Sequence, residues 1–123
     1  MKLVLDTGAL IALERNDVAM WRRLKRASDR ALTHGGVIGQ AWRGSGPRHA
    51  LLARALDYLD VRGLDRELGR GCGELLARAK LADVIDAAVV LLAEDGDQIA
   101  TSDPDDLAPL VHAADLDVEL IVV

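Results

Sequence analysis

The sequence predicts an α/β fold, a central, mostly parallel β-sheet flanked by helices. Short apolar runs that are typical of buried strands alternate with longer segments of helical periodicity. The connections between them are short, and no repeat or low-complexity tract interrupts the pattern. The 123 residues, 50% of them hydrophobic, suit a single domain over residues 1–123 with one core.

The expected strands are short runs that end at polar or turn-forming residues. The first, KLVLD, is followed by Thr-Gly and is typical of a buried strand, whereas the run at 58–61 has the weakest pattern. In chain order, strands are expected at 2–6, 31–33, 58–61, 97–101 and 118–123.

Helices are expected between these strands, and two of them carry clear start signals. Asp17 can cap a helix on which Val18, Trp21 and Leu24 share one face. Pro47 is well placed to begin another, because its fixed backbone suits the first helical position. In chain order, helices are expected at about 8–16, 17–28, 36–43, 47–56, 65–80, 82–96 and 104–113.

The composition argues against several classes of protein. No run reaches the roughly 18 apolar residues that cross a bilayer, and Asp6 interrupts the first apolar stretch, which lacks the cleavage site of a signal peptide. The single cysteine, Cys72, can form neither an intramolecular disulfide nor a zinc knuckle, which predicts a reduced, cytoplasmic protein. With no Phe and few other aromatic residues, base stacking is not expected to dominate nucleic-acid binding.

Charge is divided unevenly along the chain. All 15 Lys and Arg residues lie at or before Lys80, whereas residues 81–123 hold 11 of the 20 acidic residues and no basic one. This division predicts an acidic centre in the C-terminal third and a basic surface from the N-terminal part. An anionic partner could then use the basic side while metal cations occupy the acidic side.

Five aspartates are candidates for the acidic centre. Asp6 and Asp103 end expected strands, and sites in open parallel sheets form beyond the carboxyl ends of strands. Asp86 begins a helix that is apolar nearly all round, and Asp83 shares its face. Asp106 lies three residues beyond Asp103. The five side chains are therefore expected to converge.

Each of these acids also has a simpler interpretation. Asp103 followed by Pro104 is typical of a helix N-cap, and Asp83 can cap the helix that contains Asp86. Asp105 most simply is a solvated residue in the first turn of a helix. As a group, however, the acids need compensation, because two charges at ~4 Å repel by about 4 kcal/mol at an effective dielectric near 20.

A hard divalent cation, Mg²⁺ or Mn²⁺, supplies that compensation best, since no Lys or Arg follows Lys80. Zinc is disfavoured because the histidines are scattered, and we expect them to be surface or packing residues: His34, His49 and His112. Such a site suits hydrolysis of a phosphodiester. The sequence contains no glycine-rich phosphate-binding loop, which argues against a nucleotide triphosphatase. A small phosphatase or receiver-like domain remains an alternative, although Gly8 replaces the second aspartate of the phosphatase motif.

Four segments, LDTGALIAL, VIGQAWRG, DAAVVLLA and IATSDPDDL, occur in an order that resembles PIN domains, and among these most closely the VapC toxins of type II (VapBC) toxin–antitoxin modules. The resemblance extends from about Leu3 to Val123. It implies a PIN-like three-layer fold and a toxin that is a metal-dependent endoribonuclease, hydrolysing RNA by a Mg²⁺- or Mn²⁺-activated water. It also implies neutralisation by a cognate antitoxin, and often a homodimer.

The resemblance implies roles for the acids. Asp6, Asp86 and Asp103 match the family's catalytic and metal-binding aspartates, and Asp106 matches a further metal ligand. Asp83 is an additional acid on the helix face of Asp86 and is a further potential ligand.

Gln40 departs from the family pattern, in which many members have a glutamate at this place. Glutamine can orient water or a metal but brings no negative charge, although Asp83 could compensate. An alternative function is therefore a catalytically degenerate PIN domain that binds RNA or protein. Thr101, in the family's T-x-D motif, is expected to be auxiliary to the site.

Basic residues are candidates for binding RNA or the antitoxin, the alternative being an ordinary solvated helix face. Arg43 follows Trp42 in the family-like segment and could contact RNA or pair with an acid of the site, while Trp42 itself is expected in the core. The densest basic run comprises Arg22, Arg23, Lys25, Arg26 and Arg30.

Overall fold

The computed structural model of the chain describes residues 1–123 and contains one five-stranded sheet. The strands are β1 (Leu3–Leu5), β2 (Ala31–His34), β3 (Leu59–Arg62), β4 (Gln98–Thr101) and β5 (Glu119–Val122). Their order is β3-β2-β1-β4-β5, and every neighbouring pair is parallel. The α/β prediction is confirmed, and the sheet is entirely parallel.

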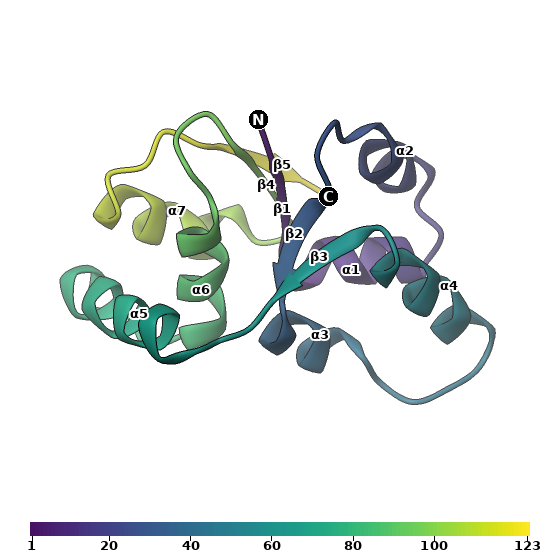
Figure 1. Cartoon of the computed structure of the whole chain (residues 1–123), viewed down its shortest axis with the longest axis horizontal. Coiled ribbons are helices and arrows are strands. Elements are labelled where there is room, and N and C mark those ends of the chain that lie inside the picture. The colour runs from purple at the N-terminus through teal and green to yellow at the C-terminus, as the bar shows by residue number, and fades with distance from the viewer.

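Seven helices cover the sheet: α1 (Thr7–Glu14), α2 (Val18–Arg26), α3 (Gly35–Ala41), α4 (Pro47–Leu56), α5 (Arg66–Ala79), α6 (Val84–Leu92) and α7 (Pro104–Ala113). Helix α1 packs against α2, α3 and α4, whereas α5, α6 and α7 pack against one another. Figure 1 shows these two groups on opposite sides of the sheet, giving three layers. No helix is both long and apolar enough to cross a membrane.

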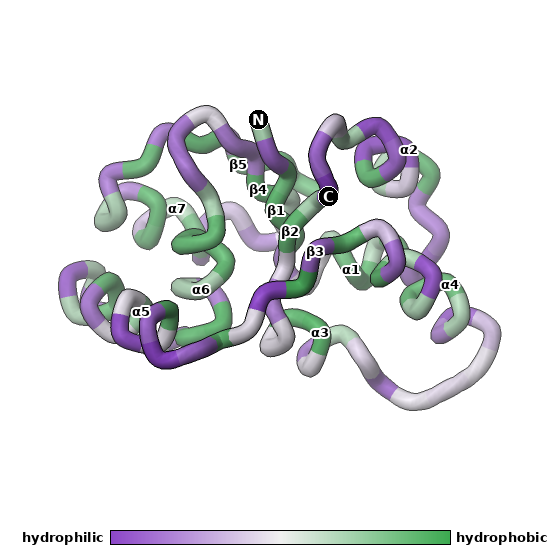
Figure 2. The backbone as a smooth tube through the Cα atoms, viewed as in Figure 1, coloured by the Kyte–Doolittle hydropathy of each residue, from purple (hydrophilic) through white to green (hydrophobic).

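The centre of the core is β1, whose three residues are all buried. Both faces of this strand are covered by helices, which explains why its sequence is continuously apolar. Figure 2 shows the apolar colour concentrated in the inner strands and α6 and the polar colour on the outer turns of α2 and α5. Asp6 therefore follows directly on a fully buried central strand.

Helix α6 ends at Leu92, earlier than the predicted end near Gly96. The reason is Asp97, a buried residue whose carboxylate accepts hydrogen bonds from the backbone N–H of Glu94, at 2.8 Å, and of Lys2, at 2.7 Å. These bonds compete with helical ones and tie the turn after α6 to the start of β1.

The expectation that Trp42 lies in the core is wrong. Its side chain is 39% exposed just beyond α3, and its ring packs edge-on against His49, with centroids 3.7 Å apart. Trp21 instead occupies the core and donates from Nε1 to the carbonyl of Leu13 at 3.0 Å. Cys72 is a buried free thiol, in agreement with a structural role.

Candidate functional site

The carboxyl ends of β1 and β4 bring the first two acids to the same edge of the sheet. The two strands are neighbours, with Leu5 opposite Ala100, and the backbone N–H of Asp6 extends the ladder to the carbonyl of Ala100 at 3.0 Å. Asp103 follows β4 after one intervening residue, Ser102. The sheet-edge rule therefore placed both aspartates correctly.

Asp86, in the first turn of α6, lies within electrostatic reach of the other four candidate acids. Its pKa is raised from the ordinary 3.8 to about 7, first by desolvation and then by the negative charges of the other acids, in the order Asp83, Asp6, Asp106 and Asp103. A shift of this kind arises where carboxylates share a site without a compensating cation. The structure thus places the other four acids that the sequence singled out within electrostatic reach of Asp86.

A chain of hydrogen bonds orients Asp6. One carboxylate oxygen accepts from the backbone N–H of Thr7 at 2.8 Å, and the other accepts from the hydroxyl of Thr101 at 2.9 Å. That hydroxyl in turn accepts from the backbone N–H of Asp103 at 3.0 Å. Because Asp6 and Thr101 are buried, these bonds hold them firmly. Thr101 is therefore the link between the two strand ends.

Asp103 occupies the N-cap position of α7, but its side chain makes no capping hydrogen bond. Pro104 follows it, so the first helical residue has no N–H that needs a cap. Asp103 raises the pKa of Asp106, one turn along the exposed surface of α7, first because protonated Asp106 can donate a hydrogen bond to the Asp103 carboxylate and then because the two negative charges repel. The capping interpretation of Asp103 is therefore wrong for its side chain, which faces another carboxyl group instead.

Asp83 caps α6, as the simpler interpretation expected. Its Oδ1 accepts from the backbone N–H of Asp86 at 3.0 Å. Beside it lies a cavity of about 270 Å³ whose acidic lining residues are Asp83, Asp86, Asp105 and Asp106. Capping and participation in the acidic cluster are thus compatible for Asp83, since the cap occupies only one of its oxygens.

The acidic cluster suits a hard divalent cation by its donor chemistry. Its side chains offer carboxylate oxygens only, and the one ion pair of the structure, Arg62 with Asp60, lies on β3 away from them. In their present positions, no three His, Cys, Asp or Glu side chains form a ready-made ligand set. Mutual repulsion of uncompensated carboxylates opposes such close approach.

Gln40 reaches the site through Thr7. The hydroxyl of Thr7 donates to the Oε1 of Gln40, which joins the end of α3 to the first residue of α1, next to Asp6. The side-chain carbonyl of Gln40 is therefore already engaged. Arg43 is exposed beyond α3 and pairs with no carboxylate, so of its two possible roles the ion pair with the site is absent and contact with RNA stays a prediction.

His34 supports the site in a way the sequence analysis missed. It is fully buried at the end of β2, where Nδ1 accepts from the backbone N–H of Gly36 at 3.1 Å. Nε2 therefore carries the proton and donates to the carbonyl of Ile85 at 3.0 Å, which positions the turn of α6 that holds Asp86. The sequence could have predicted this role, because His34 ends a strand next to β1 and therefore lies at the same edge of the sheet as Asp6.

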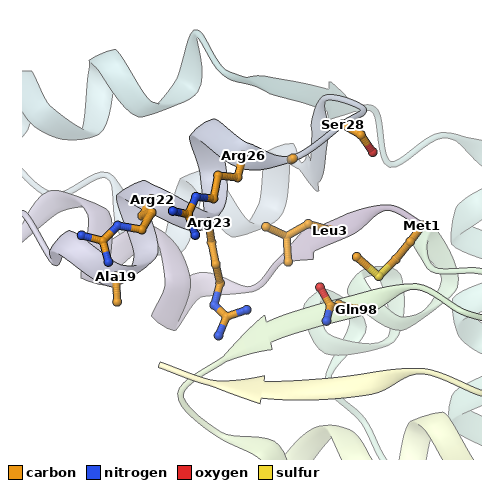
Figure 3. Close-up of a pocket in the computed structure, with 9 residues that line it drawn as sticks. Met1, Leu3, Ala19, Arg22, Arg23, Arg26, Ser28 and Gln98 are labelled. Carbon is orange, nitrogen blue, oxygen red and sulfur yellow. The ribbon is translucent and has the colours of Figure 1, made fainter.

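The basic run lies at the other end of the sheet. Arg22, Arg23 and Arg26 line a cavity together with Leu3 and Gln98, which begin β1 and β4 (Figure 3). The acidic cluster follows the carboxyl ends of the same two strands. The predicted basic surface thus exists, but it does not adjoin the acids.

Comparison with known proteins leaves the family assignment a prediction. The chain matches no protein-family model and no curated protein. The PIN-domain resemblance therefore depends on the four sequence segments and on the arrangement of the acids described above.

The raised pKa of Asp86 predicts how the stability of the metal-free protein depends on pH. Between about pH 4 and 7 the folded protein binds more protons at Asp86 than the unfolded chain, so its free energy of unfolding should fall as pH rises through this window. Urea unfolding in EDTA at pH 5, 6, 7 and 8 measures this. Asp86→Asn should make the free energy of unfolding less dependent on pH. A wild-type free energy of unfolding that rises between pH 5 and 7 would contradict a raised pKa at Asp86.

Proposed function

We propose that the chain is a PIN-domain endoribonuclease that requires Mg²⁺ or Mn²⁺, similar to VapC toxins and neutralised by a cognate antitoxin. The observation that carries the proposal is the electrostatic reach of Asp6, Asp103 and Asp106, beyond the carboxyl ends of β1 and β4, to Asp86 on α6, with no basic partner among them. Repulsion among unpaired carboxylates destabilises the folded protein, and a bound cation would offset this repulsion.

Asp6, Asp86 and Asp103 would hold the cation, with Asp106 and Asp83 at its periphery. When bound, a divalent ion supplies acidification of water and stabilisation of the charge that develops at phosphorus. Thr101 keeps the Asp6 carboxylate in one orientation. The side chain of Asp103 makes no capping hydrogen bond, so its oxygens would be available to the cation.

The shape of the site favours a polymer over a small phosphate ester. The cavity beside Asp83 and Asp86, at about 270 Å³, falls below the roughly 300–1,000 Å³ of typical small-molecule pockets. No glycine-rich loop is present to enclose a triphosphate. An RNA backbone passing over the sheet edge needs no enclosure.

The direct experiment is cleavage of total cellular RNA by purified protein free of antitoxin, with Mg²⁺ or Mn²⁺ and with EDTA. We expect cleavage that requires metal and is lost in Asp103→Asn. Folded protein that cuts no RNA with either metal would contradict the proposal.

The alternative is a degenerate PIN domain that binds RNA or protein without cleaving it. The neutral Gln40 at the site edge, with its carbonyl already bonded to Thr7, is the observation in its favour. The alternative predicts weak divalent affinity as well as absent cleavage, which separates it from an enzyme tested on the wrong RNA.

Gln40→Glu should tighten Mn²⁺ binding by about tenfold, equivalent to about 1.4 kcal/mol. The substitution adds a charge beside Asp6 while Thr7 keeps its acceptor. Isothermal titration calorimetry measures the change. Asn16→Asp adds the same charge in the exposed turn between α1 and α2 and serves as the control. Equal Mn²⁺ affinities for Gln40→Glu and wild type would show that Gln40 lies outside the metal's reach.

A further inference from the structure

Helix α2 displays a concentration of positive charge that the acidic cluster does not use. Its buried face consists of Met20, Trp21 and Leu24, so its basic side chains turn outward. Together with one residue of α4 they form what we call the α2 basic surface: Arg22, Arg23, Lys25, Arg26 and Arg54.

Two adjoining cavities hollow this surface. One, of about 450 Å³, lies between α2 and the starts of β1 and β4, and Figure 3 shows Arg23 extending from the helix toward these strands. The other, of about 460 Å³, lies between α2 and α4 and includes Lys25 and Arg54. Arg22 and Arg26 line both cavities, and no acidic residue lines either.

The arginines of this surface have no partner within the protein. None of Arg22, Arg23 and Arg26 lies within ion-pair distance of a carboxylate or donates a hydrogen bond, as the single ion pair is on β3. Arg30, by contrast, is used structurally, since it donates to the carbonyls of Asp57 and Leu59. Unpaired guanidinium groups around a cavity are suited to bind phosphate in a bidentate manner.

One acid lies close to the first cavity. Glu119 accepts a long hydrogen bond, 3.3 Å, from the side-chain amide of Gln98, which lines the cavity. This contact orients the amide but leaves the three arginines uncompensated. In a protein of net charge −5, such a surface is a local exception that attracts anions.

We propose that the α2 basic surface binds consecutive phosphates of an RNA strand at a distance from the acidic cluster. The two cavities continue around α2 and share Arg22 and Arg26, so the surface is longer than one phosphate needs. A four-residue strand is about 13 Å long, so the two ends of the sheet are separated by more than one nucleotide. Only RNA longer than a dinucleotide can contact both.

The identity of the ligand as RNA rests on the proposed function, but the site itself does not. Binding through phosphates should occur without metal and without cleavage, because arginine provides the charge. The surface should therefore contribute to the KM for long RNA while leaving the cleavage step to the acidic cluster.

The test is the triple variant Arg22→Gln/Arg23→Gln/Arg26→Gln of the full chain, titrated in EDTA against a fluorescent 20-nucleotide RNA and followed by fluorescence anisotropy. The matched control is Arg66→Gln/Arg70→Gln/Arg78→Gln, which removes the same charge from the exposed face of α5. We expect binding at least about tenfold weaker for the α2 variant, and a salt slope smaller by about 2, since each lost contact to single-stranded RNA lowers the slope by about 0.7.

Equal affinities of the α2 variant and the α5 control would overturn the proposal, as would wild-type protein that binds no RNA in EDTA. Displacement of RNA by poly-glutamate at equal charge concentration would also overturn it, because it would indicate an acidic protein as the partner. Selective loss of binding in a protein that never cleaves RNA would support the surface and contradict the nuclease. The two failures are therefore distinguishable.

Discussion

Replacing Asp6 by asparagine is expected to reduce metal-dependent RNA cleavage by about 100- to 1,000-fold, because a bound cation contributes several kcal/mol and each 1.36 kcal/mol is a factor of ten in rate. Asparagine keeps the size of the side chain and can still accept from Thr7. It removes the buried negative charge at the end of β1. Initial rates on the same RNA, at saturating Mn²⁺, measure the effect.

Asp29→Asn is the matched control, since Asp29 is exposed in the loop between α2 and β2, before the amino end of β2 and away from the carboxyl ends that precede Asp6 and Asp103. Its rate should equal that of the wild type. Circular dichroism should show that both variants are folded. Wild-type activity in folded Asp6→Asn protein would mean that the Asp6 carboxylate has no part in the reaction.

Replacing Gly8 by alanine is expected to destabilise the protein by about 2–3 kcal/mol, the usual range for overpacking a core contact. A Cβ at this position would lie 2.1 Å from Oγ, 2.5 Å from Cβ and 2.7 Å from the backbone nitrogen of Ser102. The backbone cannot yield without moving the turn that carries Asp103. We therefore expect loss of cleavage together with lower stability, measured by urea unfolding.

Gly69→Ala provides the comparison for Gly8→Ala. Gly69 lies within α5, and nothing lies within 4 Å of a Cβ built there. The same change should therefore stabilise the protein by about 0.5–1 kcal/mol through helix propensity. If Gly8→Ala were as stable as wild type, this result would contradict the close contact between Gly8 of α1 and Ser102 in the turn between β4 and α7.

The positions of the acids could be predicted because they follow from topology. An apolar run such as that of β1 must be a central parallel strand, and the residue after it must lie at the carboxyl edge. Asp103 follows β4 by the same reasoning. The position of Asp86 could be predicted because its helix is apolar nearly all round and must therefore pack on the sheet.

The supporting contacts could not be predicted in the same way. The bond from Thr7 to Gln40 joins residues 33 positions apart, and that from His34 to Ile85 joins residues 51 apart. Such pairs depend on how α3 and α6 rotate about their axes, which hydrophobic periodicity does not determine to within a hydrogen bond.

The location of the basic run could have been inferred but was not. Arg22, Arg23 and Arg26 precede β2 in the chain, and a crossover between parallel strands must return to the amino edge of the sheet before the next strand begins. The end of α2 is therefore near that edge, opposite the acids. Charge composition alone suggested two surfaces without separating them in space.

The most direct test of the metal site is a calorimetric titration of Mn²⁺ into wild-type protein and Asp86→Asn at pH 6.5, where most Asp86 carboxyls still carry a proton. We expect saturable binding to the wild type, with release of protons from Asp86 because its pKa is raised to about 7, and binding at least about tenfold weaker in the variant. Equal binding by both proteins, or none by the folded wild type, would show that the acidic cluster is not a metal site.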